Sequence, residues 1–168
     1  TVYQSLAQYR QALDYFRRGL AIRLKTLPED HSEIGVSYNN IGLSAQSLGY
    51  YQEAIDAYHH CERIYLKRFG TNHKYVGSLY LNLSALYYLM GDYGQATGYA
   101  LKALPIQRQT FGENSMGVAN VYVKLGAVNL DEGRFDLGLQ YHQKALDIER
   151  TVLGSDNLTV AIQWMNTG

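Results

Sequence analysis

Histidine and cysteine are the residues of this sequence best suited to metal binding or nucleophilic chemistry. His59 and His60 are adjacent, so on a helix their side chains would point about 100° apart and would be poorly placed to share a metal ion. His31 and His73 occupy equivalent places in a repeating pattern, which favours a role at the start of two helices. Cys61 belongs to a column of small residues and is expected to pack. We therefore expect no metal site and no catalytic cysteine.

Glycines and carboxylates do not form a catalytic pattern either. The sixteen glycines are spread over repeat-spaced turns and packing positions instead of clustering in a phosphate-binding loop. Asp131 and Glu132 are paired acidic residues at the expected end of a helix, where solvation accounts for them. We therefore expect a protein that is not an enzyme and that carries no cofactor.

Charge and composition exclude further classes of partner. Fifteen basic residues balance fifteen acidic ones, whereas nucleic acids and anionic membranes favour a basic patch. No apolar run approaches the roughly 20 residues of a membrane-spanning helix, and no signal peptide is visible. The single cysteine cannot form an internal disulfide, which is typical of a reducing compartment. The sequence thus predicts a cytoplasmic protein with neither nucleic acid nor membrane as its partner.

The elements that must position any binding residue come from an internal repeat. An aromatic residue recurs every 42 residues, at Tyr9, Tyr51, Tyr93 and Phe135. Apolar residues at three- and four-residue spacing predict a series of helices, and no strand pattern competes with them. The predicted helices are 9–27, 31–48, 51–68, 73–90, 93–110, 115–132 and 135–152, and residues 1–8 resemble the tail of an earlier helix.

The ends of the predicted helices also recur in register. Residues that stop a helix fall at Pro28, Gly70, Gly112 and Gly154. Residues suited to cap the next helix fall at Asp30, Asn72, Asn114 and Asp156. Glu33 follows Asp30 by three residues and completes an approximate capping box.

Pro105 is the one residue that breaks a local rule. It lies inside the predicted helix 93–110, where it removes the hydrogen bond to the Leu101 carbonyl and costs about 3 kcal/mol unless accommodated. We predict a kink at this position that alters the curvature between the third and fourth units.

Each unit carries one signature in its first helix and another in its second. The first-helix signature reads Tyr38-x-x-Ile41-Gly42, Tyr80-x-x-Leu83-Ser84, Tyr122-x-x-Leu125-Gly126 and Trp164-x-x-Thr167-Gly168. The second-helix columns are Ala12, Ala54, Ala96 and Gly138, then Phe16, Tyr58, Ala100 and His142, then Gly19, Cys61, Ala103 and Ala145. Small residues in these columns let neighbouring helices approach closely, while the aromatic and aliphatic members fill the space beside them.

This pattern resembles the tetratricopeptide repeat, whose signature is W-x2-L-G-x2-Y followed by A-x3-F. The usual period is about 34 residues, and a period of 42 with longer helices is similar to the kinesin light chain variety. The resemblance implies an all-α fold, a right-handed superhelical solenoid of antiparallel helix pairs. We expect one domain over 1–168, with units starting near 9, 51, 93 and 135 and truncated ends, as a fragment of a longer protein.

The resemblance also places the first helix of each unit on the concave face. Residues beside the signature aromatic then form the rungs of a ladder along a groove. The candidate peptide-binding residues are Asn39, Asn40, Ser78, Leu81, Asn82, Asn120, Val123 and Lys124. The same columns also contain Val36, Ile162, Met165 and Asn166, and Leu43 and Ala85 are further apolar rungs.

The chemistry of the ladder suits an extended peptide. An asparagine can donate to a peptide carbonyl and accept from its N–H, so it can hold a backbone without reading its side chains. Lys124 could contact a carboxylate, and Leu43, Leu81, Ala85 and Val123 could receive apolar side chains. With Lys124 as the only basic rung, an internal, partly apolar segment is favoured over a C-terminal carboxylate. The alternative is that these asparagines only solvate an exposed helix face.

We therefore expect a non-catalytic scaffold or adaptor that binds a protein or peptide partner. Two alternatives stay open. The array could be the regulatory sensor arm of a larger signalling ATPase or protease, binding within its own chain or complex. It could also self-associate through its truncated ends, since each would leave an apolar face for another unit to cover.

Overall fold

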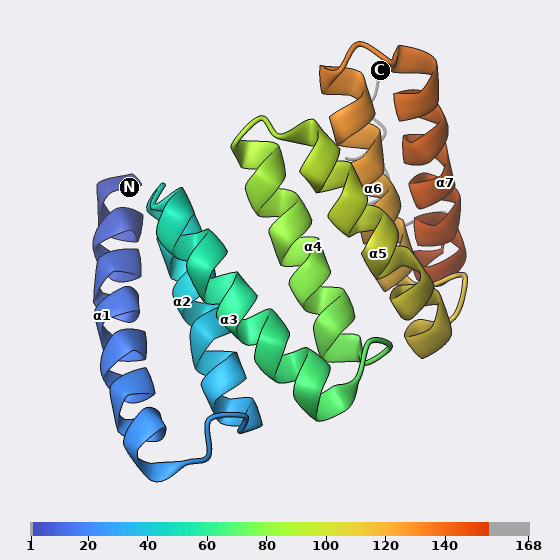
Figure 1. Ribbon diagram of the computed structural model, residues 1–168. Coiled ribbons are helices and arrows are strands. Elements are labelled where there is room, and N and C mark those ends of the chain that lie inside the picture. The colour runs from blue at the N-terminus through green and yellow to red at the C-terminus, as the bar shows by residue number, and fades with distance from the viewer. Residues whose placement is uncertain (1, 155–168) are drawn as a thin grey trace.

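The computed structural model describes residues 2–154, which form seven helices and no strand (Figure 1). The helices are α1 (Val2–Thr26), α2 (Ser32–Ser47), α3 (Tyr51–Phe69), α4 (Lys74–Leu89), α5 (Tyr93–Phe111), α6 (Met116–Asp131) and α7 (Phe135–Leu153). The all-α prediction is confirmed, and from α2 onward every helix lies within one residue of its predicted bounds.

The helices form antiparallel pairs arranged in two rows. The pairs α2–α3, α4–α5 and α6–α7 make the most extensive contacts, and α1 packs on α2. The inner row is α2, α4 and α6, in which neighbours approach one another; the outer helices α1, α3, α5 and α7 do not. Contact between successive pairs is uneven, because α5 packs on α6 more extensively than α3 packs on α4. The arrangement is a solenoid of helix pairs.

The first helix differs from its prediction. Instead of a separate tail and a helix starting at residue 9, α1 runs unbroken from Val2 to Thr26. In the other units a glycine with positive φ makes the turn between the two helices, at Gly49, Gly91 and Gly133. Ala7 stands at the equivalent place in α1, and an alanine strongly disfavours that left-handed conformation, so the helix continues.

The capping residues lie one position later than predicted. His31 and His73 cap α2 and α4, each ring Nδ1 accepting from the backbone N–H two residues on, at 3.3 and 3.2 Å. Ser115 caps α6 by accepting from the Val118 N–H at 3.4 Å. The predicted caps Asp30, Asn72 and Asn114 are therefore wrong, and Asp156 lies outside the described residues. The reason is that an imidazole nitrogen accepts a hydrogen bond as a carboxylate does, so composition alone left the register open.

The predicted helix stops are confirmed. Gly70, Gly112 and Gly154 follow α3, α5 and α7 with φ of 77°, 88° and 85°, a conformation that favours glycine. Pro105 does not break α5, which continues to Phe111 as one helix. The kink at Pro105 stays a prediction.

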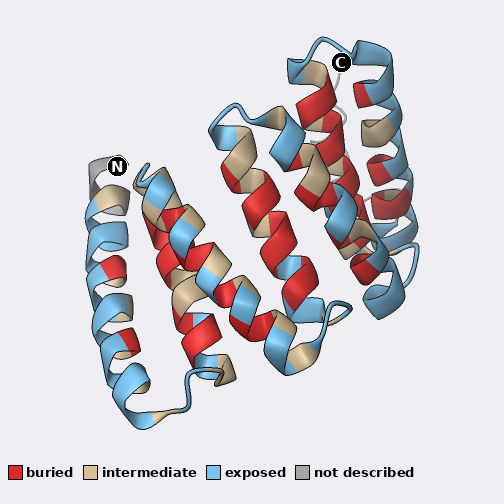
Figure 2. Ribbon diagram, viewed as in Figure 1, coloured by how far each residue is buried: buried red, intermediate tan, exposed pale blue. Residues whose placement is uncertain are grey.

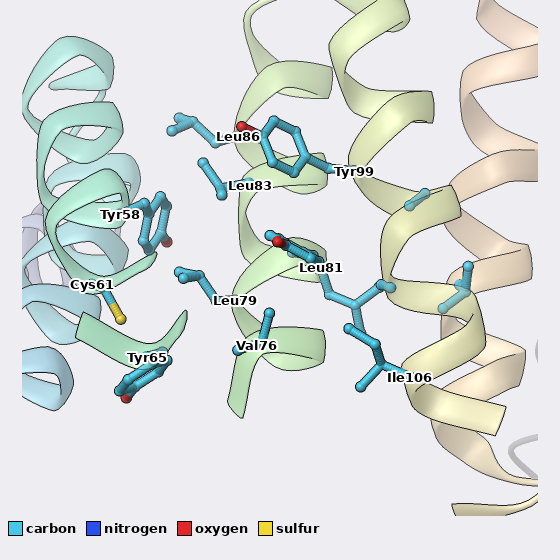
Figure 3. Packing of buried hydrophobic residues seen from close by; sticks show 14 of the residues in the cluster. Tyr58, Cys61, Tyr65, Val76, Leu79, Leu81, Leu83, Leu86, Tyr99 and Ile106 are labelled. Atoms are coloured by element: carbon cyan, nitrogen blue, oxygen red, sulfur yellow. The ribbon is translucent and has the colours of Figure 1, made fainter. Parts of the chain in front are cut away.

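The core runs through the middle of the array, with α4 at its centre (Figure 2). Figure 3 shows Leu79, Leu83 and Leu86 of α4 among the buried residues contributed by neighbouring helices. Within each unit the two signature columns are matched in size. A Cβ on Gly42 would lie 2.5 Å from the Tyr58 ring, so the ring fits there because residue 42 has no side chain.

The same matching recurs with other residues in the later units. A Cβ on Gly126 would lie 2.7 Å from the His142 ring, whose burial lowers its pKa. In the pair α4–α5 the two columns hold Ser84 and the small Ala100, and the Ser84 hydroxyl donates to the Ala96 carbonyl at 2.8 Å. Close helix pairing is therefore kept while the residues that achieve it change.

Candidate functional site

The inner row brings two of the predicted asparagines together. Asn82 on α4 donates its side-chain N–H to the Asn39 side-chain oxygen on α2 at 3.0 Å. Both residues are half-buried. The amide pair thus bridges α2 and α4, and one donor and one acceptor of the predicted ladder are used within the protein. The remaining amide N–H groups and the Asn82 oxygen are available to a ligand.

Lys124 stands at the Asn82 position of the next unit but has a different neighbour. The repeat equivalent of Asn39 is Leu81, which offers no acceptor to its side chain. Within residues 2–154, Lys124 forms no hydrogen bond or ion pair. Burial lowers its pKa, because the ammonium loses water without gaining a partner. Lys124 is therefore a donor with unused capacity on the inner row.

A cleft of about 270 Å³ opens beside Lys124, between α4 and α6. Its walls are almost entirely apolar. The lining residues are Ser84, Ala85, Tyr88, Leu89, Val123, Lys124, Ala127 and Val128. At its edge the Tyr88 hydroxyl donates to the Asp131 carboxylate at 2.6 Å, which ties α4 to α6. The cleft can accept an apolar side chain next to the Lys124 ammonium, which can bind a carboxylate.

The other predicted rungs are spread along the same row. Ser78 and Asn120 are exposed, while Asn40 and Val123 are half-buried. Leu81 is only 8% exposed and belongs to the core (Figure 3), so it has little surface left to contact a ligand. The structure brings Asn39 and Asn82 into contact and places Val123 and Lys124 in one cleft.

Some of the remaining predicted rungs lie at the surface or in the cleft, and others lie outside the described residues. Val36 and Leu43 expose apolar surface on α2, and Ala85 lines the cleft. The predicted outer rungs Ile162, Met165 and Asn166 lie outside the described residues.

Of the residues that line the cleft, sequence reasoning placed only Ala85, Val123 and Lys124 on the groove. Tyr88 and Leu89 lie one helical turn beyond Ala85, and Ala127 and Val128 one turn beyond Lys124. Ordinary helical spacing was the available signal, since residues three and four apart share a face. The repeat itself gave no hint, because Tyr88 has Gln46 as its equivalent in the preceding unit.

Metal-ligating side chains do not gather in the described part of the chain. Residues 2–154 contain no cluster of three or more His, Cys, Asp or Glu side chains that could hold a metal ion. Cys61 is buried, and burial raises the pKa of its thiol to about 12, so the thiolate is disfavoured. Among the same residues no helix combines the length and the apolar character needed to cross a bilayer.

Comparison with known proteins identifies the repeat. Family models described as tetratricopeptide repeat match residues 33–109 and residues 1–33. Comparison with curated proteins finds no match to this sequence. Tetratricopeptide repeats generally mediate interactions between proteins and typically serve as non-catalytic scaffolds.

Solved structures share the fold at low sequence identity. BtubC (BKLC) from P. vanneervenii superposes with a TM-score of 0.81 at 21% identity, over 90% of this chain and 60% of BtubC. A Podosopora anserina protein described as a kinesin light chain with nearly identical TPR-like repeats gives 0.79 at 19% identity, over 96% of this chain and 76% of that one. This chain therefore spans about three fifths of the length of BtubC. It belongs to the tetratricopeptide repeat family, and its array has the fold of kinesin light chain-like repeats.

Proposed function

We propose that the inner row binds an extended segment of a protein partner, so that the chain acts as an adaptor or scaffold. The observation that carries this proposal is Lys124, a half-buried ammonium without a partner in the described chain, at the edge of an apolar cleft. Leaving such a group unpaired costs free energy, which a ligand carboxylate would recover. The cleft beside it would take the neighbouring apolar side chain of the same segment.

The asparagines would hold the backbone of that segment. Asn82 lies on the helix that also supplies one wall of the cleft, and its bond to Asn39 orients its amide. Asn40 and Asn120 would extend the contact toward the neighbouring units. Each contact is modest, so affinity depends on engaging several units at once.

The partner in this proposal is a peptide or protein segment and not nucleic acid or membrane, as the balanced charge suggests. A reducing, cytoplasmic setting belongs to the same proposal, since the one cysteine is buried and unpaired. The second candidate function is the regulatory arm of a larger signalling protein, in which the segment held by the groove would belong to the same chain or complex. Self-association through the ends of the array is a third arrangement.

The test compares wild type with Asn82→Ala/Lys124→Ala against a displayed library of random peptides. We expect wild type to select segments that pair an apolar residue with an acidic one, and the double variant to lose that selection. Helicity and melting temperature should stay nearly unchanged. Asn72→Ala/Lys25→Ala is the matched control, because both residues are exposed and lie away from the cleft. Equal selection by wild type and the double variant would move the site to another face.

A further inference from the structure

A second cavity, of about 450 Å³, opens on the opposite side of the array. It lies between the outer helices α1 and α3, with α2 as its floor, and we call it the first outer groove. Leu24 of α1, Glu29 of the following loop and Tyr38 of α2 line one side. Because the chain is a repeat, the same place can be compared in the later units.

The equivalent place in the third unit is filled by an arginine of the chain itself. Arg108 of α5 donates from its guanidinium to the Tyr122 hydroxyl at 2.7 Å and pairs with the Glu113 carboxylate at 2.8 Å. The three residues come from the outer helix, the inner helix and the loop between them. A guanidinium in this groove is therefore bound by one tyrosine and one glutamate.

The first outer groove keeps both acceptors and lacks the arginine. Tyr38 and Glu29 stand two repeats before Tyr122 and Glu113, and Leu24 stands two repeats before Arg108. The Tyr38 ring stacks on the His60 ring, with centroids 4.7 Å apart. Within residues 2–154 neither the Tyr38 hydroxyl nor the Glu29 carboxylate has a hydrogen-bond or ion-pair partner. The cavity is open where the guanidinium of the third unit would lie.

The middle unit shows that this acceptor pair is not a general property of the repeat. Thr71 replaces the glutamate there, so the loop supplies no carboxylate. Burial, and after it the neighbouring Glu62 carboxylate, raises the pKa of Tyr80, the tyrosine of that unit. Only the first of the three grooves combines both acceptors with an apolar residue at the arginine position.

We propose that the first outer groove binds a guanidinium group, the arginine side chain of a partner peptide, through Glu29 and Tyr38. The planar fork of a guanidinium can bond the carboxylate and the hydroxyl together, as Arg108 does in the third unit. The Leu24 side chain would pack against the methylene groups of the guest. This site lies apart from the inner groove and does not depend on the function proposed for it.

The charges around the cavity set the direction of entry. Lys67 is paired with Asp30 at 3.0 Å, and Arg63 donates to the His60 ring at 2.6 Å, both along the α3 side. The Arg63 guanidinium repels a guanidinium guest that approaches from α3. On the α1 side the nearby Arg23 is already held by Glu33 and Ser37. The guest therefore enters along α1, as Arg108 does along α5.

The first experiment titrates the protein with N-acetyl-arginine amide, with the lysine and citrulline analogues as matched probes, and follows Tyr38 by NMR. We expect saturable shifts with the arginine probe, weaker shifts with lysine and none with the neutral citrulline. Glu29→Gln should weaken arginine binding at least about tenfold, because it removes a charge-assisted contact. Glu113→Gln is the control and should leave the Tyr38 titration unchanged. No arginine-dependent shift, or equal binding of the lysine probe, would overturn the proposal.

A second experiment exchanges the two grooves. Leu24→Arg places a guanidinium where Arg108 stands in the third unit, so it should fill the first outer groove and abolish binding of the arginine probe. Arg108→Leu should open the third groove and add a second site, reported by Tyr122. Circular dichroism checks that both variants stay folded. A folded Leu24→Arg variant that binds the probe as wild type does would contradict the assignment.

Discussion

The two junctions of the inner row use equivalent positions in opposite ways. Between α2 and α4, Asn82 donates to Asn39, so the two polar side chains pair with each other. Between α4 and α6 the same two positions hold Lys124 and Leu81, so within residues 2–154 the ammonium has no acceptor, and a cleft opens beside it. Two residue differences between the equivalent junctions thus separate a bridged amide pair from a site with an unused donor. We call these the closed junction and the open junction.

The largest expected effect comes from a core substitution in α4, the helix that both junctions share. Leu83 of α4 is completely buried, so Leu83→Ala should lower the free energy of unfolding by about 2–5 kcal/mol through lost burial and a residual cavity. Both junctions should lose hydrogen-exchange protection together. Leu89→Ala, on the same helix at a residue that is 51% exposed, is the control and should change stability by less than about 0.5 kcal/mol. Loss of protection at one junction alone would show that α4 does not couple them.

Acid should separate the two junctions. The His142 ring packs under α6 at Gly126, and burial lowers its pKa. The unfolded chain therefore binds the proton more readily, and stability is fully present above the unfolded pKa of about 6.5 and falls as the pH drops below it. Hydrogen exchange between pH 7 and 5 should show α6 losing protection before α2, where Gly42 instead faces a tyrosine.

The variant His142→Tyr sharpens this test. It copies the Gly42–Tyr58 pairing between α2 and α3 and removes the titrating group, so the difference in acid sensitivity between α6 and α2 should disappear. An unchanged difference would assign the acid response to another histidine.

A smaller effect concerns the tie at the edge of the open junction. The Asp131 carboxylate accepts from the Tyr88 hydroxyl, and this bond, with burial, raises the pKa of Tyr88 to about 12. Because the folded pKa lies above the unfolded value, the contribution is present below about pH 10 and is lost as the pH rises through about 12. Tyr88→Phe should cost about 0.5–1 kcal/mol at neutral pH, measured by denaturant unfolding. An equal cost at pH 7 and well above pH 12 would rule out the hydrogen bond as its origin.

The smallest expected effect is the coupling energy of the amide pair in the closed junction. A double-mutant cycle on Asn39→Ala and Asn82→Ala should give a coupling energy of about 0.5 kcal/mol, since both amides are half exposed. The same cycle on Leu81→Ala and Lys124→Ala should show no polar coupling. Equal coupling in the two cycles would erase the distinction between the junctions.

The fold was predictable because its signals are local and repeated. Gly70 and Gly112 stop helices by a backbone requirement that glycine alone meets easily, and the repeat reports that requirement more than once. The prediction failed where a unit departs from the repeat, and it was displaced by one residue where two adjacent residues could both cap a helix. Ala7 replaces the turn glycine and lets α1 continue, and His31 caps a helix that Asp30 was expected to cap.

The candidate site was predictable only in part, because it depends on pairs of residues from different helices. The sequence identifies Asn82 and Lys124 as equivalent positions, but not that one has a partner and the other does not. Leu81 was expected on the groove surface by its register, and packing against the core covers it. Which residues of neighbouring helices meet depends on side-chain packing, and the columns of the repeat do not give that information.

The uneven contact between successive pairs has a mechanical consequence. The link from α3 to α4 is less extensive than the link from α5 to α6, where Arg108 also bridges helix, loop and helix. A solenoid bends most easily where neighbouring helix pairs share least surface. Its flexibility should therefore be concentrated between the pairs α2–α3 and α4–α5. Under tension applied at the two ends in an optical trap, we expect the array to extend first at α3–α4, while the later units stretch as one stiffer spring.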